Sequence, residues 1–184
     1  NENEEALNHY RTGYELLKKR NYRNAAIELE QAISLNANYG EAYYLLAQAY
    51  NVLNEYNNAI DAYEKTRELG VKPEKAADAL AKLYNKSAIA SLQQRKYSEA
   101  ISLFAKALQF DPNNAQTHYA MGLAYNGMRD ETKAKLAFEQ AVKADPKYAK
   151  ALNALGDIQR RNHDYGPAAL TYQKAIDADK TYMV

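Results

Sequence analysis

Hydrophobic residues recur along the chain with the spacing of amphipathic helices, and the whole pattern returns at a nearly fixed interval. Within each interval, two stretches have apolar residues at i, i+3, i+4 and i+7. A short polar break separates them, such as Lys19-Arg20-Asn21 or Met128-Arg129-Asp130. Side chains at this spacing lie on one face of a helix. The pattern therefore predicts pairs of helices joined by short turns.

Several sets of positions keep the same phase in every interval. Ala25, Ala59, Ala100, Ala134 and Ala168 are separated by 34, 41, 34 and 34 residues. A second set is small: Gly13, Ala47, Ala88, Gly122 and Gly156. A third set is large: Leu29, Tyr63, Phe104, Phe138 and Tyr172. A period of this length is typical of stacked helical units, so we expect the small residues to let paired helices approach and the large side chains to cover the contact.

These features, with the closing Asp111-Pro112 and Asp145-Pro146, resemble the tetratricopeptide repeat family. The resemblance implies an all-α fold, a right-handed superhelical solenoid of five helix–turn–helix repeats that forms a single domain over residues 1–184. We expect the repeats at approximately 6–39, 40–73, 81–114, 115–148 and 149–182. Where the family has tryptophan, the first helices have other residues that we interpret as packing substitutes: His9, Tyr43, Tyr84, His118 and Leu152.

The one long interval, of 41 residues, has seven more than the others, and these fall at Glu74–Leu80. The inserted segment is rich in alanine and has no helix breaker after Pro73. Seven residues are close to two helical turns, so the insertion leaves the helix face nearly unchanged. We therefore predict a helical extension at 74–80, which lengthens the first helix of the third repeat to about 74–93.

The family resemblance also implies that the first helices line a concave groove, the usual binding surface. Helical spacing projects these residues into it: Leu7, Tyr10, Tyr14, Leu17, Glu41, Tyr44, Gln48, Asn51, Lys82, Asn85, Ile89, Leu92, Gln116, Tyr119, Leu123, Asn126, Lys150, Asn153, Asp157 and Arg160. Tyrosine gives contact area at low entropic cost, and amides pair with a peptide backbone. We expect partner binding at Tyr10, Tyr14, Tyr44, Gln48, Asn51, Lys82, Asn85, Tyr119, Asn126 and Asn153. The alternative is that these side chains only contact one another and neighbouring repeats.

Composition narrows the possible functions. The net charge is +1, which gives no basic field suited to nucleic acid, and no apolar run is long enough to insert into a membrane. The chain has no cysteine, so it has neither disulfides nor thiolate metal sites, and this fits a cytoplasmic or an extracytoplasmic location equally. Three scattered histidines and the absence of phosphate-binding or hydrolase motifs predict no metal, no cofactor and no enzymatic activity.

The leading hypothesis is a scaffold that binds a peptide or partner-protein segment in its concave groove. The alternatives are a self-assembling structural protein and a docking arm of a larger protein whose activity lies elsewhere. RNA binding is disfavoured by the near-neutral charge and the 34-residue period. The clamp that some family members use for chaperone tails is incomplete, because its asparagine positions hold Tyr10 or Tyr14 and Leu45, although Lys82 and Lys86 fit its cationic positions.

The C-terminal edge offers a route to a homo-oligomer. The last residues, 179–184, match residues 145–150 in phase, as though another first helix were about to begin. The final helix is then expected to leave parts of Ala169, Tyr172, Ala175 and Ile176 uncovered. Such an edge needs a cover, so we expect it to pack against another copy or against a following segment of a longer protein.

Overall fold

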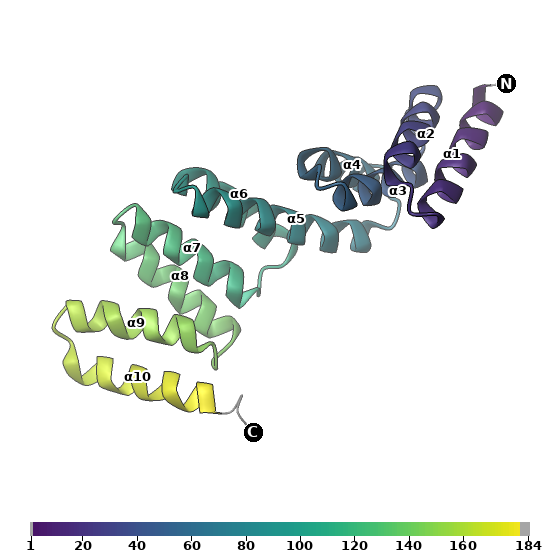
Figure 1. The fold of residues 1–184 in the computed structure, drawn as a ribbon. Coiled ribbons are helices and arrows are strands. Elements are labelled where there is room, and N and C mark those ends of the chain that lie inside the picture. Colours follow the sequence, from purple (N-terminus) through teal and green to yellow (C-terminus); the bar gives the residue numbers. More distant parts are fainter. Residues whose placement is uncertain (1, 181–184) are drawn as a thin grey trace. The chain divides into compact units, whose positions relative to one another are not determined.

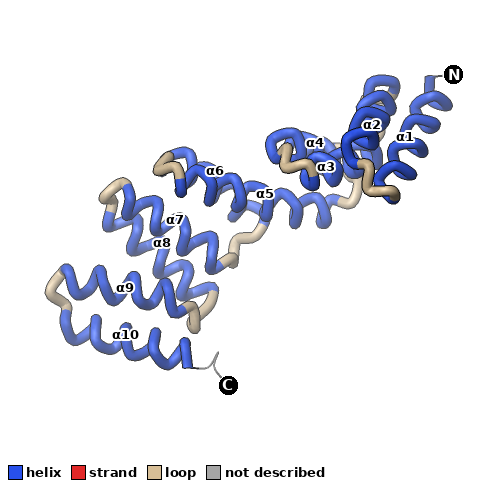
Figure 2. Tube along the Cα trace, in the orientation of Figure 1, coloured by secondary structure: helices blue, strands red, loops and turns tan. Residues whose placement is uncertain are grey.

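The computed structural model describes residues 2–180, which form ten α-helices and no strand (Figure 1). Short turns join them (Figure 2). Each pair is antiparallel and amphipathic, as the spacing predicts. The pairs are α1 (Glu2–Lys18) with α2 (Tyr22–Leu35), α3 (Gly40–Val52) with α4 (Tyr56–Glu68), α5 (Pro73–Gln93) with α6 (Tyr97–Phe110), α7 (Ala115–Gly127) with α8 (Glu131–Ala144), and α9 (Ala149–Arg161) with α10 (Tyr165–Lys180).

The chain divides into two compact units, residues 1–83 and 84–184, with the boundary inside α5. In the first unit α1 packs on α2, α2 on α3 and α3 on α4. In the second unit α6 packs on α7, α7 on α8, α8 on α9 and α9 on α10. Each of these helices thus contacts its neighbours in chain order, the contact pattern of a stacked repeat. The sequence analysis predicts one domain, whereas the contacts of the structure form two compact units.

The close contact within each pair is confirmed at the in-phase small residues. A Cβ atom built on Gly122 would lie 2.4 Å from Cε1 of Phe138, and one on Gly13 would lie 2.7 Å from Cγ of Leu29. Both of these large side chains are fully buried. Even the Cβ of alanine at these two glycine positions would overpack the pair.

The turns within the helix pairs share one backbone conformation. A residue with φ between 59° and 65° follows the first helix in all five pairs: Arg20, Asn54, Arg95, Arg129 and His163. The next N–H then reaches back to the helix, as where Asn21 donates to the carbonyl of Leu16 (2.9 Å) and Asp130 to that of Tyr125 (3.0 Å). This is the Schellman closure, in which glycine is the residue that adopts the left-handed conformation without strain.

The inserted residues 74–80 lie within α5, a single helix of 21 residues. Pro73 is its first residue, a position where proline's missing N–H removes no intrahelical hydrogen bond. Ala76 and Leu80 are fully buried. The inserted turns therefore have an apolar face that packs.

The exposure of α10 differs in part from the expectation. Ala175 is only 1% exposed, because it packs in a cluster with Leu152 of α9, so the prediction that it is uncovered is wrong. Ile176 is 49% exposed and Ala169 is exposed, as predicted. Residues 181–184, most of the segment that matches the start of another first helix, lie outside the described residues.

Candidate functional site

A hollow on the projected surface lies in the second unit, between two successive first helices, α7 and α9. It has a volume of about 300 Å³. The residues that line it are Tyr119, Leu123 and Asn126 from α7 and Lys150, Asn153, Ala154, Asp157 and Arg161 from α9. It therefore combines an aromatic ring, aliphatic surface, two primary amides and charged groups, the mixture typical of sites that fix a ligand's orientation.

The ring of Tyr119 is held from two sides. It lies edge-on against Tyr148, with ring centroids 5.5 Å apart and planes at 81°, and tilted against Phe138 at 5.6 Å. Phe138 is in turn fixed over Gly122. Burial raises the pKa of the Tyr119 hydroxyl, so it stays protonated and can donate a hydrogen bond. A rigid, half-buried tyrosine of this kind loses little entropy when a ligand contacts it.

The charged groups of the cavity are positioned by their neighbours. The Asp157 carboxylate accepts a hydrogen bond from the Tyr172 hydroxyl at 2.6 Å and lies 3.9 Å from Nη2 of Arg160. Nε of Arg161 donates to Glu131 of α8 at 3.1 Å. Lys150, Asp157 and Arg161 give the lining charges of both signs, and the Arg161 charge is already paired with Glu131. The cavity therefore combines charged groups of both signs with two amides and an aromatic ring.

Asn85 lies on α5 within the second unit and is partly buried. Its Oδ1 atom is buried and has no hydrogen-bond partner among the described residues. A buried acceptor left unpaired costs free energy. Because the atom is buried, it is not a contact point for a ligand on the surface of α5.

The corresponding surface of the first unit, on α1 and α3, is mainly aromatic. Tyr10 stacks on Tyr39, with ring centroids 4.8 Å apart. Burial and the nearby Glu41 carboxylate raise the pKa of Tyr10. Tyr44 lies edge-on against Tyr63 at 5.9 Å, and Nζ of Lys72 lies 4.4 Å from the centre of its ring. The first-unit tyrosines thus have protein partners of their own, in addition to the surface they expose.

The remaining predicted residues differ in exposure. Tyr14 is 43% exposed, with Nζ of Lys18 over its ring at 4.6 Å. Asn51 and Lys82 are exposed, and Gln48 is half-buried. Lys82 belongs to the first unit and Asn85 to the second, although both are on α5. The structure therefore brings together three of the ten predicted residues in one cavity, Tyr119, Asn126 and Asn153.

Two lining residues, Ala154 and Arg161, were missed by the helical projection. The projection names Arg160, whereas the cavity is lined by Arg161. Arg161 is four residues after Asp157, and spacings of both three and four return to the same helix face. The sequence signal was present, but spacing alone does not choose between two adjacent arginines.

The histidines each interact separately with protein groups. His9 pairs with Glu28 at 2.7 Å, His118 with the carbonyl of Pro112 at 2.9 Å, and His163 with the Tyr165 hydroxyl at 2.9 Å. Within residues 2–180 no cluster of histidine, aspartate and glutamate could hold a metal ion. In the same range no helix is both long and apolar enough to cross a membrane.

Comparison with protein families gives matches along most of the chain. A family model described as Tetratricopeptide repeat matches residues 10–70 and 119–182. A second family model, described as TPR repeat, matches residues 88–128. Among curated proteins, the Hsp70-Hsp90 organising protein of Plasmodium falciparum (isolate 3D7) is 29% identical over 128 residues. That match covers 68% of this chain and 22% of the relative, so the chain spans about a fifth of the relative's length.

Solved structures share the fold at low sequence identity. MamA (residues 41 to the end) from Desulfovibrio magneticus RS-1 superposes with a TM-score of 0.56 at 22% identity, covering 96% of each chain. YrrB, described as a TPR protein with an unusual peptide-binding site, gives a TM-score of 0.55 at 21% identity, covering 97% of this chain and 88% of YrrB. PilF of Pseudomonas aeruginosa gives a TM-score of 0.52 at 20% identity, covering 96% of this chain and 78% of PilF. These likenesses establish the all-α superhelical repeat fold.

Proposed function

The chain belongs to the tetratricopeptide repeat family, whose members generally serve as scaffolds for protein–protein interaction, and we propose that it binds an extended segment of a partner protein along its first helices, without enzymatic activity of its own. The observation that supports this most directly is the cavity between α7 and α9, with Tyr119 on one side and the Asn126 and Asn153 amides beside it. Its lining combines a concave surface, an aromatic ring and hydrogen-bonding groups.

The chemistry of the lining suits a peptide backbone. Each amide of Asn126 and Asn153 has one acceptor and two donors, so it can pair with both the carbonyl and the N–H of an extended chain. The Tyr119 hydroxyl adds a donor. Lys150 and Asp157 offer charges of both signs to polar side chains of the segment.

The first unit contributes to the same function in this proposal. The exposed surface of Tyr14 and the half-buried rings of Tyr10 and Tyr44 offer apolar contact, flanked by Gln48 and Asn51. Lys82 adds an exposed cation on α5. We propose that these residues contact further parts of the partner.

The relatives support peptide recognition in general and leave the partner open. YrrB is described as having a peptide-binding site, and the Plasmodium relative is named as an organising protein for two chaperones. Binding of chaperone tails is not what the residues favour here, because Tyr10 or Tyr14 and Leu45 replace the asparagines of that clamp. An internal segment that presents its backbone and polar side chains fits the second-unit cavity better.

The test uses peptides selected from a random phage-displayed library against the whole chain, with affinity measured by isothermal titration calorimetry. We expect Tyr119→Ala to weaken binding by about 30-fold, which corresponds to a loss of about 2 kcal/mol. Asn153→Ala is expected to weaken it less. Tyr165→Ala is the control, because Tyr165 is a tyrosine of the second unit that is exposed and is not part of the cavity lining.

The proposal fails if selected peptides bind equally well to Tyr119→Ala and to the unmodified chain. It also fails if Tyr165→Ala weakens binding as much as Tyr119→Ala does. Far-ultraviolet circular dichroism of each variant must show unchanged helix content, so that a lost interaction is not confused with lost structure.

A further inference from the structure

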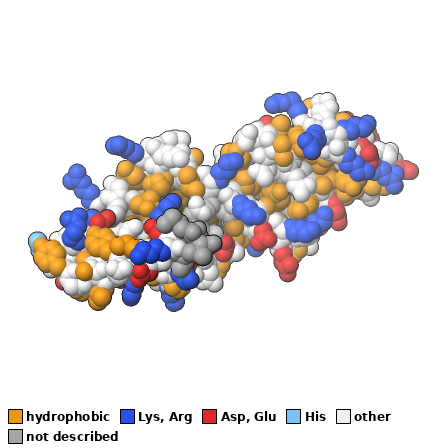
Figure 3. Space-filling view, turned by 60° about the horizontal axis from the view of Figure 1, so that its bottom comes forward, with side chains coloured by type: hydrophobic (Ala, Val, Ile, Leu, Met, Phe, Trp, Pro, Cys, Tyr) orange, Lys and Arg blue, Asp and Glu red, His pale blue; other side chains and the backbone are white. Residues whose placement is uncertain are grey.

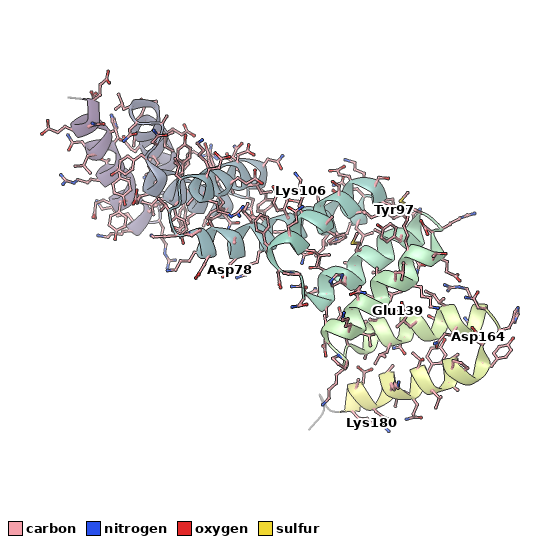
Figure 4. The ribbon with its side chains drawn as sticks, turned by 180° about the vertical axis from the view of Figure 1, so that it is seen from behind. Asp78, Tyr97, Lys106, Glu139, Asp164 and Lys180 are labelled. Atoms are coloured by element: carbon pink, nitrogen blue, oxygen red, sulfur yellow. The ribbon has the colours of Figure 1, made fainter. Side chains whose placement is uncertain are left out.

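The α7–α9 cavity has a cation and a carboxylate at separate places along one helix. Lys150 and Asp157 both line it from α9, seven residues apart. Seven residues are close to two helical turns, so the two residues lie on one face of α9 with their Cα atoms about 10 Å apart. Figure 4 labels Asp164 in the turn that follows α9, and Asp157 is the charge nearer to that turn.

The Asp157 carboxylate is held in place by the next helix. The Tyr172 hydroxyl of α10 donates a hydrogen bond to Oδ1 of Asp157 at 2.6 Å, and this bond is the main cause of the raised pKa of Tyr172. A carboxylate has about four lone-pair sites, so one hydrogen bond leaves most of them open. Nη2 of Arg160 lies 3.9 Å from the same oxygen, but both side chains are more than half exposed, and such pairs contribute little. The carboxylate is therefore oriented and still able to accept.

The preceding helix pair shows that packing does not need this hydrogen bond. Thirty-four residues earlier, the ring of Phe138 lies against Gly122. The ring of Tyr172 lies against Gly156 in the same way. The residue of α7 in phase with the carboxylate is Leu123, which has no polar group. The hydroxyl and the carboxylate thus occur together in the pair α9–α10, and neither is required for the contact between a ring and a glycine.

Lys150 is the unpaired cation of the cavity. Its side chain is exposed, and it forms no ion pair with any residue in the described range 2–180. Arg161, by contrast, is paired with Glu131. In Figure 3, acidic and basic side chains of the second unit lie close together rather than in separate patches of one sign. With a net charge of +1 the chain has no strong long-range field, so the charges of a ligand are distinguished by the individual side chains that they meet.

We infer that the α7–α9 cavity recognises a segment with an acidic and a basic side chain about three residues apart, the acidic one at Lys150 and the basic one at Asp157. This inference rests on the proposed function, because it specifies the segment that is bound there. An extended segment in the polyproline II conformation has three residues per turn and rises about 3.1 Å per residue, so residues three apart lie on one side, about 9 Å from each other. That spacing matches the two charges of α9. The Asn153 amide lies between them along the helix, where it can pair with the backbone of the segment.

Opposite charges at the two positions make the site directional. A segment with its charges exchanged brings its basic side chain to Lys150 and its acidic side chain to Asp157, and like charges next to each other are unfavourable. Tyr172 is a positioning residue in this arrangement, because it holds the Asp157 carboxylate without being part of the cavity lining.

The test uses a peptide selected against the whole chain from a random phage-displayed library, and the same peptide with its acidic and basic residues exchanged. Isothermal titration calorimetry measures both affinities. We expect the unmodified chain to bind the exchanged peptide about tenfold more weakly. In the chain with both Lys150→Glu and Asp157→Lys, we expect the preference to be reversed. Lys150→Glu alone, which leaves the Tyr172–Asp157 hydrogen bond in place, is expected to remove most of the preference.

The matched control is the chain with both Lys174→Glu and Asp177→Lys. These two residues are exposed on α10 and outside the cavity lining, and the double substitution leaves the net charge unchanged, as the one in the cavity does. We expect this control to keep the original preference. Tyr172→Phe keeps the ring on Gly156 and removes the hydroxyl, so we expect a smaller preference between the two peptides at unchanged helix content in circular dichroism. A merely structural role of the hydroxyl would leave the preference as it is.

Three results overturn the inference: selected peptides without such a charge pair, equal binding of the two peptides to the unmodified chain, or a preference that Lys150→Glu with Asp157→Lys leaves as it is. Tyr119→Ala separates this inference from the proposed function. If Tyr119→Ala weakens binding but the charge exchange has no effect, peptide binding in the cavity stands and only the charge recognition fails. If Tyr119→Ala leaves binding unchanged, or if the library yields no binder, the proposed function fails and the inference fails with it.

Discussion

Two glycines and one arginine of this chain allow the free-energy cost of a left-handed backbone conformation to be measured. Gly70 has φ of 70°, and a Cβ built on it meets no atom within 4 Å. Gly166 also has open space at its Cβ position but lies in the first turn of α10 with an ordinary φ. The space around each Cβ position is otherwise open, but Gly166 precedes Pro167, and proline disfavours the helical conformation for a preceding residue that has a Cβ.

The two substitutions are expected to differ in size. In Gly70→Ala, the left-handed conformation costs about 1–2 kcal/mol, partly offset by about 0.4–1 kcal/mol from the stiffer unfolded chain, so the free energy of unfolding falls by about 1 kcal/mol. In Gly166→Ala the backbone has no left-handed cost, and the stiffer unfolded chain opposes the steric restriction from Pro167, so the free energy of unfolding is expected to change by less than in Gly70→Ala. Urea unfolding followed by far-ultraviolet circular dichroism measures both.

Arg129 provides the reverse exchange, since its φ is 61°. Arg129→Gly removes the left-handed strain and is expected to raise the free energy of unfolding by roughly 0.5–1 kcal/mol after the greater entropy of unfolded glycine is subtracted. Arg129→Ala is the control, because it removes the guanidinium but keeps a Cβ in the strained conformation. The reasoning is refuted if Gly70→Ala lowers the free energy of unfolding no more than Gly166→Ala does, or if Arg129→Ala stabilises the chain as much as Arg129→Gly.

Three further outcomes follow from packing, capping and burial. Ala134→Leu, at a fully buried alanine of α8, should overpack the helix pair and lower the free energy of unfolding by about 1–3 kcal/mol in urea titration. Asn114→Ala removes the side chain that accepts from the Thr117 N–H at 2.9 Å and caps α7, so thermal unfolding should show a loss of about 0.5–2 kcal/mol, and an unchanged melting temperature would contradict it. Burial, with the nearby Tyr44, raises the pKa of Tyr63 to about 12. The Tyr63 hydroxyl therefore stays protonated to a higher pH in the folded chain than in the unfolded chain. Stability should therefore fall as pH rises from about 10 towards 12, and the fall should be smaller in Tyr63→Phe.

The sequence predicted the helix pairs because amphipathic spacing and a fixed period depend on local chemistry. The contact of Gly122 with Phe138 follows from the in-phase small and large residues, and the helix over 74–93 follows from a run of strong helix formers without a breaker. The left-handed turn residues could not be predicted from residue type. Arg20, Arg95 and Arg129 occupy a conformation that favours glycine, and the hydrogen bonds across the turn hold them there.

The candidate site was predicted only in outline. Helical spacing places Tyr119, Asn126 and Asn153 on one face, and these three residues do line one cavity. The choice of Arg161 over Arg160, the unpaired oxygen of Asn85 and the Tyr172–Asp157 hydrogen bond depend on how neighbouring helices pack. A spacing rule has no access to these distances.

The sequence by itself determined the helices, their pairing and the faces that they bury, because each of these depends on residues close together in one repeat. Only the tertiary structure decided which projected residues meet. It placed the division between two compact units inside α5, buried Ala175 while leaving Ile176 half-exposed, and formed a cavity between α7 and α9. The physical reason is that burial and cavities arise from contacts between successive helices, whose separation depends on all the side chains between them rather than on the residues of a single repeat.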